Sequence, residues 1–131
     1  MPVTDTIVRM LRQLGYAITG RRFIEVAEEG PNRLVLETNR GTFVFDQRRG
    51  VAARDGKQIA RFKDIKFIDI IRDKEIDEHT HWEVKLYLNV LHRIRVGETL
   101  DDAQASIVGA RLVEITGSKL LAWKESHDLK R

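Results

Sequence analysis

Apolar residues along the chain follow two spacings, which predict a helix at each end and strands between them. Residues 1–15 carry five apolar residues at helical spacing: Ile7, Val8, Met10, Leu11 and Leu14. This spacing predicts an amphipathic helix that stops at Gly15. In residues 22–97 the pattern changes to short runs of alternating apolar and polar residues that are separated by turn residues. We therefore expect antiparallel strands in this part of the chain.

Within residues 22–97 the sequence indicates the position of one hairpin turn and the buried face of one strand. Asp55-Gly56 separates two short apolar runs and predicts a tight hairpin. Further along, every second residue is apolar: Trp82, Val84, Leu86, Leu88 and Val90. This alternation predicts a half-buried strand with Trp82 directed into the core. Because consecutive strands are joined by short turns, we expect a meander in which each strand pairs with the next.

A second helix is predicted over residues 99–117, beginning at Thr99 and ending at Gly117. One face of this helix carries Ala105, Val108, Leu112 and Ile115. Another apolar set, which suggests that the helix is covered on more than one side, consists of Leu100, Ala103, Ile107 and Ala110. No linker interrupts the pattern, so residues 1–131 are interpreted as a single domain. The predicted class is mainly β with helices (α+β), with six or seven antiparallel strands.

Several segments resemble the bacterial pleckstrin-homology-like (PH-like) domains between about residues 33 and 120. The similar segments are "TFVFDQRRG", "IARFKDIKFIDI", "WEVKLYL" and "ASIVGARLVEITGSKL". The resemblance implies a curled antiparallel sheet or barrel that is closed by a C-terminal capping helix. It leaves the N-terminal helix as an addition to the family fold.

Composition narrows the classes of chemistry. The chain has no cysteine, which excludes disulfides, a thiolate nucleophile and cysteine-ligated metals. Neither a secretory leader nor a run of eighteen apolar residues is visible, so we expect a soluble, cytoplasmic protein. No serine lies in a nucleophile-elbow pattern, and no glycine-rich phosphate loop precedes a helix. We expect no cofactor, and no small-molecule substrate is evident.

Charge is unevenly distributed, although the net charge is only +3. Residues 40–66 hold eight basic residues against three acidic ones, so this stretch is locally cationic. Six of the basic residues are candidates for anion binding: Arg40, Arg48, Arg49, Lys57, Arg61 and Lys63. A solvated sheet edge is the competing interpretation, because charged edges discourage strand pairing.

The segment "IDEHTHWEV" places His79 and His81 two residues apart. In a strand such residues share a face at a separation of roughly 6.6 Å, near enough to hold one metal ion. A zinc site needs three or four protein ligands, and only these two can be named. The histidines are therefore weak metal candidates, and exposed residues that precede a strand are the preferred interpretation.

These observations favour a non-enzymatic binding or scaffold module that recognises a protein partner or a second copy of itself. The N-terminal helix is the expected contact surface, because its broad apolar stripe must be covered by a second copy or another protein, unless it packs on the chain's own strands. One alternative is a weak anion binder that uses residues 40–66 on a membrane surface or, less favoured, on nucleic acid. Another is an uncharacterised enzyme or metal-binding protein that uses His79 and His81.

Overall fold

The computed structural model describes residues 22–74 and 80–125, which form a mainly β fold with one α-helix. The strands are β1 (Ile24–Glu29), β2 (Arg33–Thr38), β3 (Gly41–Asp46), β4 (Val51–Arg54), β5 (Lys57–Arg61), β6 (Phe67–Lys74), β7 (Thr80–Asn89), β8 (His92–Thr99) and β9 (Lys119–Glu125). A short 3-10 helix, η1 (Phe62–Asp64), joins β5 to β6, and α2 (Asp102–Thr116) joins β8 to β9. The α+β class is confirmed.

The first sheet is the predicted meander, with five strands in the order β1-β2-β3-β4-β5. A two-residue turn joins β4 to β5, where Asp55 and Gly56 have φ angles of 51° and 83°. These left-handed conformations match the twist of the flanking strands, and Asp55 and Gly56 both adopt them readily. The Asp55 carboxylate also accepts a hydrogen bond from the backbone N–H of Thr42 at 2.9 Å. The hairpin predicted from Asp55-Gly56 is therefore confirmed.

The second sheet contains a strand pairing that the sequence analysis did not predict. It has four strands in the order β8-β7-β6-β9, and β9 runs parallel to β6. In the part of the chain that the structure describes there are nine strands in two sheets, without a closed barrel. The expectation of six or seven strands, all antiparallel, was wrong because the apolar run after Gly117 returns to the sheet as β9 and pairs in parallel with β6.

Two residues separate the end of β8 from the start of helix α2. Thr99, the expected first residue, lies in β8, and Asp101 is the N-cap. The Asp101 carboxylate accepts hydrogen bonds from the N–H groups of Ala103 at 3.0 Å and Gln104 at 3.4 Å. It thereby satisfies two of the donors that a helix leaves unpaired at its start. Gly117 ends the helix with φ at 76°, as predicted.

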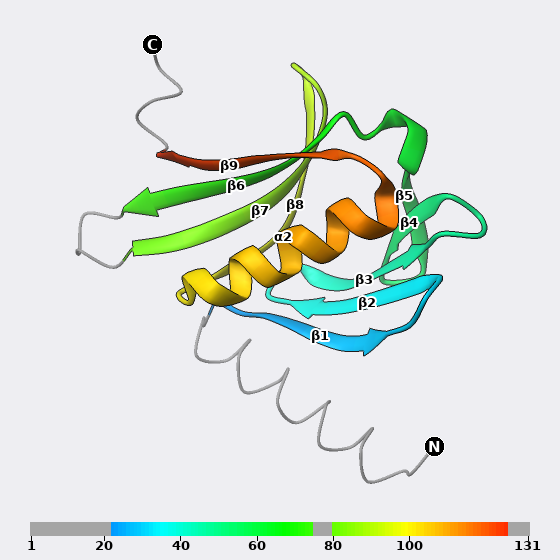
Figure 1. Ribbon diagram of the computed structural model, residues 1–131, viewed down its shortest axis with the longest axis horizontal. Helices are drawn as coiled ribbons and strands as arrows, with labels where there is room; N and C mark the ends of the chain where they lie inside the picture. Colours follow the sequence, from blue (N-terminus) through cyan, green and yellow to red (C-terminus); the bar gives the residue numbers. More distant parts are fainter. Residues whose placement is uncertain (1–21, 75–79, 126–131) are drawn as a thin grey trace, which may run out of the picture.

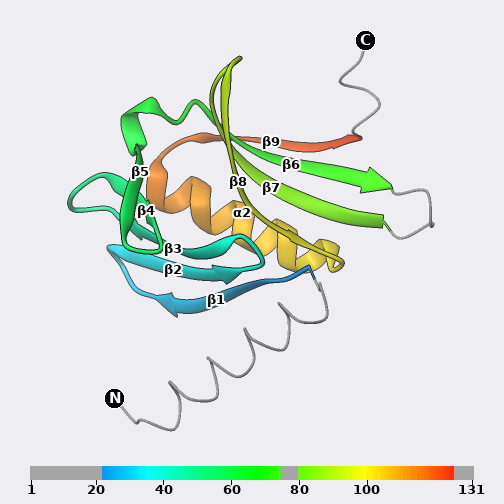
Figure 2. The ribbon, with the colours of Figure 1, turned by 180° about the vertical axis from the view of Figure 1, so that it is seen from behind.

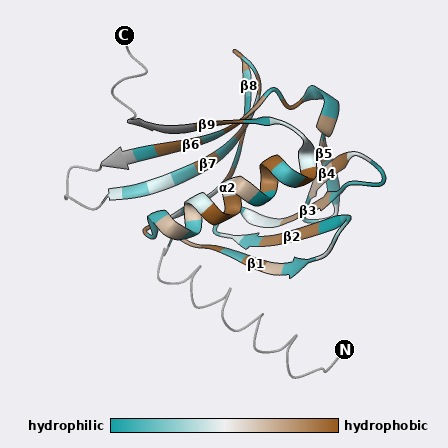
Figure 3. Ribbon diagram, viewed as in Figure 1, coloured by the Kyte–Doolittle hydropathy of each residue, from teal (hydrophilic) through white to brown (hydrophobic). Residues whose placement is uncertain are grey.

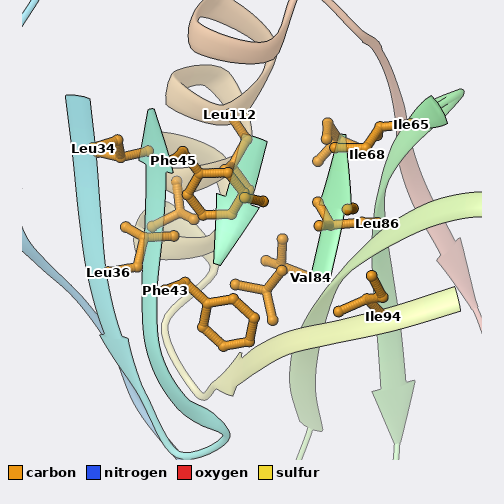
Figure 4. Packing of buried hydrophobic residues seen from close by; sticks show 14 of the residues in the cluster. Leu34, Leu36, Phe43, Phe45, Ile65, Ile68, Val84, Leu86, Ile94 and Leu112 are labelled. Carbon is orange, nitrogen blue, oxygen red and sulfur yellow. The ribbon is translucent and has the colours of Figure 1, made fainter. Parts of the chain in front are cut away.

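The core lies between the two sheets and under α2. Figure 4 shows side chains of both sheets, among them Phe43, Phe45 and Leu86, pointing toward one another with Leu112 of α2 above them. Hydrophobic segments of both sheets and of α2 appear brown in Figure 3. The predicted inner face of α2 is buried: Ala105, Val108, Leu112 and Ile115. The second apolar set is not covered, because Leu100 and Ile107 are 55% and 50% exposed.

Two contacts fasten β8 to the first sheet. The Thr38 hydroxyl at the end of β2 donates a hydrogen bond to the Val96 carbonyl at 2.5 Å. Next to it, Gly97 lies so close to Thr38 and Ile24 that an added Cβ would be 2.7 Å and 2.8 Å from their side-chain carbons. Sheet packing at this point therefore requires the absence of a side chain.

Strand β7 follows the predicted alternation over most of its length. Val84, Leu86 and Leu88 are buried, whereas Trp82 is half-buried rather than part of the core. Val90, expected on the same buried face, lies beyond the end of β7 and is 75% exposed. The turn between β7 and β8 projects past the ends of the neighbouring strands in Figures 1 and 2.

Candidate functional site

The basic residues of the stretch 40–66 fall at opposite ends of the first sheet. Arg54 pairs with Lys57 at the tip of the β4–β5 hairpin, whereas Val51 pairs with Arg61 at its open end. By strand geometry these two ends lie roughly 10 Å apart. The cationic stretch is therefore divided between two separate surfaces, and the one at the open end of the hairpin borders a hollow.

At that open end a hollow of about 630 Å³ lies between the β5–η1 segment and the β7–β8 hairpin. Its polar lining includes Arg61, Lys63, Lys66 and His92, and Leu88 and Ile59 contribute apolar wall. We call this hollow the basic cleft. Of the six anion-binding candidates, Arg61 and Lys63 line it, and Arg40, Arg48, Arg49 and Lys57 do not.

Local packing explains why the two lysines are presented to solvent. Between them Ile65 is only 5% exposed and belongs to the core. Phe62 packs its ring 6.5 Å from that of Phe45. The Lys66 backbone N–H donates to the Tyr87 carbonyl at 2.8 Å, which ties this segment to β7. Lys63 and Lys66 are both exposed, because the buried neighbours turn their side chains outward.

The charge in the basic cleft is only partly neutralised. The nearest acid, Asp64, is engaged by Arg61 at 3.1 Å. Within the described residues neither Lys63 nor Lys66 makes an ion pair. A second hollow of about 530 Å³ shares both lysines and adds Lys119. The two lysines thus form a ridge with a hollow on each side, and this arrangement can bind anionic groups.

A second polar cluster surrounds Glu98, whose side chain is 10% exposed. Its carboxylate accepts hydrogen bonds from Arg40, with Nη2 at 2.6 Å and Nε at 3.0 Å. Arg22 Nε lies 3.4 Å away, and His81 Nε2 lies 3.6 Å away. Asn39 donates its amide to the carboxylate at 3.3 Å and accepts from the Glu98 backbone N–H at 2.9 Å. This Glu98 cluster joins the β2–β3 turn to β7 and β8.

The Glu98 cluster contains two residues that the sequence analysis proposed as site residues, Arg40 and His81. Arg40 is bound to Glu98, so its guanidinium is already engaged with a carboxylate. His81 was interpreted as an exposed residue before a strand, but it lies within β7 and is only 4% exposed. Glu98 accepts charge-assisted hydrogen bonds in a poorly solvated place. The cluster therefore connects the strands and is not an open ligand site.

Charges around Glu98 shift its titration. Burial alone raises the pKa of Glu98, but the hydrogen bonds and charge of Arg40 outweigh burial. The hydrogen bond from Asn39 and the charge on His81 act in the same direction as Arg40. The net result is a pKa below the ordinary value of a glutamate.

Glu98→Gln is expected to weaken the fold at neutral pH and to change its acid sensitivity. A carboxyl with a lowered folded-state pKa binds protons more readily in the unfolded chain, so it stabilises the fold above its ordinary pKa. That contribution is lost as the pH falls through the lowered folded-state pKa. The expected cost at neutral pH is on the order of 1.5 kcal/mol, the scale of a hydrogen bond to a charged group.

Urea unfolding of wild type and Glu98→Gln across the acid range measures this contribution. The difference in free energy of unfolding should be constant above about pH 5.5 and should shrink as the pH falls through the acid range. Glu114→Gln, which removes a carboxylate that is 73% exposed on α2, is the matched control. A difference that stays the same at all pH values would contradict the assigned role of the Glu98 charge.

The metal hypothesis receives no support from the described residues. His79 lies outside them, and within them three or more His, Asp or Glu side chains do not gather in a way that could hold a metal ion. Glu98, whose carboxylate lies 3.6 Å from His81 Nε2, is already contacted by two arginines.

The predicted partner-binding surface belongs to the N-terminal part of the chain. Ile7, Val8, Met10, Leu11 and Leu14 lie outside the described residues, so recognition of a protein partner or a second copy through them stays a prediction. Of the helices described, none has the length and apolar character needed to cross a membrane. Comparison of the chain with family models, with curated proteins and with solved structures found no match.

Sequence reasoning missed the parts of the basic cleft that come from the β7–β8 hairpin. Leu88, Asn89 and His92 line it although they lie more than twenty residues beyond Lys66. The one signal in the sequence is the pair Val90-Leu91, which stands where turn residues such as glycine or asparagine are expected.

Proposed function

We propose that the chain is a non-enzymatic binding module that holds an anionic, phosphate-bearing ligand at the basic cleft. The observation that carries this proposal is the exposed ridge of Lys63 and Lys66, which has no ion pair among the described residues and a hollow on each side. Lysine supplies three donors on a flexible stem, which suits the oxygens of a phosphate group. Arg61, on the side of the lysines, and His92, on the facing β7–β8 hairpin, add further donors.

The apolar wall of the cleft strengthens the electric field of its cations. Leu88 and Ile59 provide apolar wall beside the cations, and such low-dielectric surfaces concentrate the field of nearby charges. One acid, Asp64, lines the cleft, and its carboxylate is paired with Arg61. A multivalent anion that spans the ridge would contact both lysines together.

Lys63→Gln/Lys66→Gln is expected to lower the affinity for inorganic tripolyphosphate by at least about tenfold. Each lost charge removes on the order of 1 kcal/mol of attraction at the protein surface. Isothermal titration calorimetry of the full chain measures this change, and rising salt should weaken the wild-type binding.

Arg54→Gln/Lys57→Gln is the matched control for this test. It removes the same number of charges at the other end of the β4–β5 hairpin, outside the basic cleft. The control should keep affinity within about twofold of wild type, since screening at physiological salt acts over about 8 Å. Equal losses in the two variants would mean that net charge, and not the cleft, governs binding.

A further inference from the structure

The turn that joins β7 to β8 exposes two aliphatic side chains. Val90 is 75% exposed and Leu91 is 96% exposed, the two most exposed large hydrophobic side chains in the described ranges. We call this pair the apolar tip. In the described part of the chain Asp55 alone, apart from glycines, has a positive φ, so the turn requires no special residue type. Polar residues would satisfy it equally well.

Nothing in the fold of the hairpin uses these two side chains. Asn89 pairs directly with His92, and the Asn89 side-chain oxygen accepts from the Leu91 backbone N–H at 2.9 Å. This contact closes the turn through the backbone and Asn89 alone. An adjacent, exposed aliphatic pair that does not support the fold is a candidate for contact with another molecule, and its surroundings decide which kind.

The apolar tip adjoins the basic cleft, which contains Lys63 and Lys66. Asn89 and His92, the residues on either side of it, line the basic cleft together with Lys63 and Lys66. On the neighbouring positions Arg93 lies over the Tyr87 ring at 5.3 Å, and Lys66 is bonded to the same residue through its backbone. Figures 1 and 2 show the turn projecting beyond the sheet on the side where η1 leads into β6.

We propose that the apolar tip inserts into the interface of an anionic lipid bilayer while the basic cleft binds the lipid headgroups. This inference rests on the proposed function and names its ligand as a membrane surface. A bilayer places anionic phosphates above an apolar layer. Two aliphatic residues at the tip suit the apolar layer, and the nearby lysines of the basic cleft suit the phosphates. Single-stranded nucleic acid would call instead for exposed aromatic residues that stack on bases, and the tip has none.

Vesicle cosedimentation tests the two parts of the surface separately. The full chain should sediment with phosphatidylcholine vesicles that contain phosphatidylserine and should remain in solution with phosphatidylcholine alone. Val90→Ser/Leu91→Ser should lower the bound fraction at least about tenfold, because it removes the buried apolar area. The same variant should bind tripolyphosphate as wild type does. Ile107→Ser, at a half-exposed position on α2, is the matched control and should sediment as wild type does.

A fluorescent label reports insertion directly, because the chain has no other cysteine. Leu91→Cys with a polarity-sensitive dye should shift its emission to the blue on anionic vesicles. Ile107→Cys with the same dye should not shift. Circular dichroism establishes that each variant is folded before it is assayed.

The outcomes separate this inference from the proposed function. Tripolyphosphate binding without vesicle binding, or vesicle binding that the tip variant leaves unchanged, overturns the inference and leaves the proposed function standing. Absence of both interactions overturns both. Tight binding to duplex DNA with no vesicle binding assigns the basic cleft to nucleic acid and likewise overturns the membrane assignment.

Discussion

Replacing Phe43 with alanine is expected to lower the free energy of unfolding by about 3–5 kcal/mol. Phe43 is completely buried in β3, and its ring stacks on that of Phe45 with centroids 6.3 Å apart. Truncation removes the apolar contacts and leaves a cavity between the two sheets, because the surrounding strands can only partly collapse. The loss would be a large part of the stability of a domain, which is typically about 5–15 kcal/mol in total.

Urea unfolding followed by circular dichroism measures this loss. Val44→Ala is the matched control, because Val44 is the next residue of β3, faces the other side of the sheet and is half-buried. Its expected cost is about 1 kcal/mol or less. Similar losses in Phe43→Ala and Val44→Ala would show that the assigned facing of β3 is wrong.

Local features of the sequence predicted much of the fold. Alternation identified the buried face of β7, because the side chains of a strand point to opposite faces. Asp55-Gly56 identified the β4–β5 turn, because its two central residues need positive φ. Gly117 identified the end of α2 for the same conformational reason. Each of these signals depends on neighbours in the sequence and not on the rest of the molecule.

Features that depend on distant parts of the chain were not predicted. Strand β9 pairs with β6 in parallel across some fifty residues, and parallel pairing leaves no hairpin turn to recognise. Thr99 has the chemistry of a helix cap, but β8 extends to it because it pairs with Trp82. The second apolar set of α2 remained exposed, although its spacing is that of a covered face.

At the candidate site, too, local features were predicted and long-range contacts were not. Residues 40–66 were correctly identified as cationic, but the hairpin register separates Lys57 from Arg61 and leaves only part of the stretch at the basic cleft. Val90 was interpreted as a continuation of the buried face, since one more alternating residue cannot be distinguished from a turn by periodicity. Glu98 carried no signal, because its partner Arg40 lies 58 residues away.

Gly97→Val is expected to destabilise the protein by about 3 kcal/mol, at the upper end of the usual cost of overpacking. An added Cβ would lie 2.7 Å from the Thr38 Cβ and 2.8 Å from Ile24 Cγ1. Neither atom can easily move away, since Thr38 is hydrogen-bonded to Val96 and Ile24 is only 3% exposed. Gly109→Ala is the control, because its Cβ would meet mainly the flexible end of Ile70. In the control, improved helix propensity offsets part of the contact.

The same substitution probes the Glu98 cluster, because Gly97 immediately precedes Glu98 in β8. Relief of the clash requires β8 to move away from the β2–β3 turn, which carries Asn39 and Arg40. Glu98 would then lose the partners that hold its pKa low. Gly97→Val should therefore also weaken the dependence of stability on pH below about pH 5. Urea unfolding of both glycine variants at neutral and at acid pH measures the two effects together. A Gly97→Val protein with the stability and pH dependence of wild type would show that the two sheets do not pack at Gly97 as described.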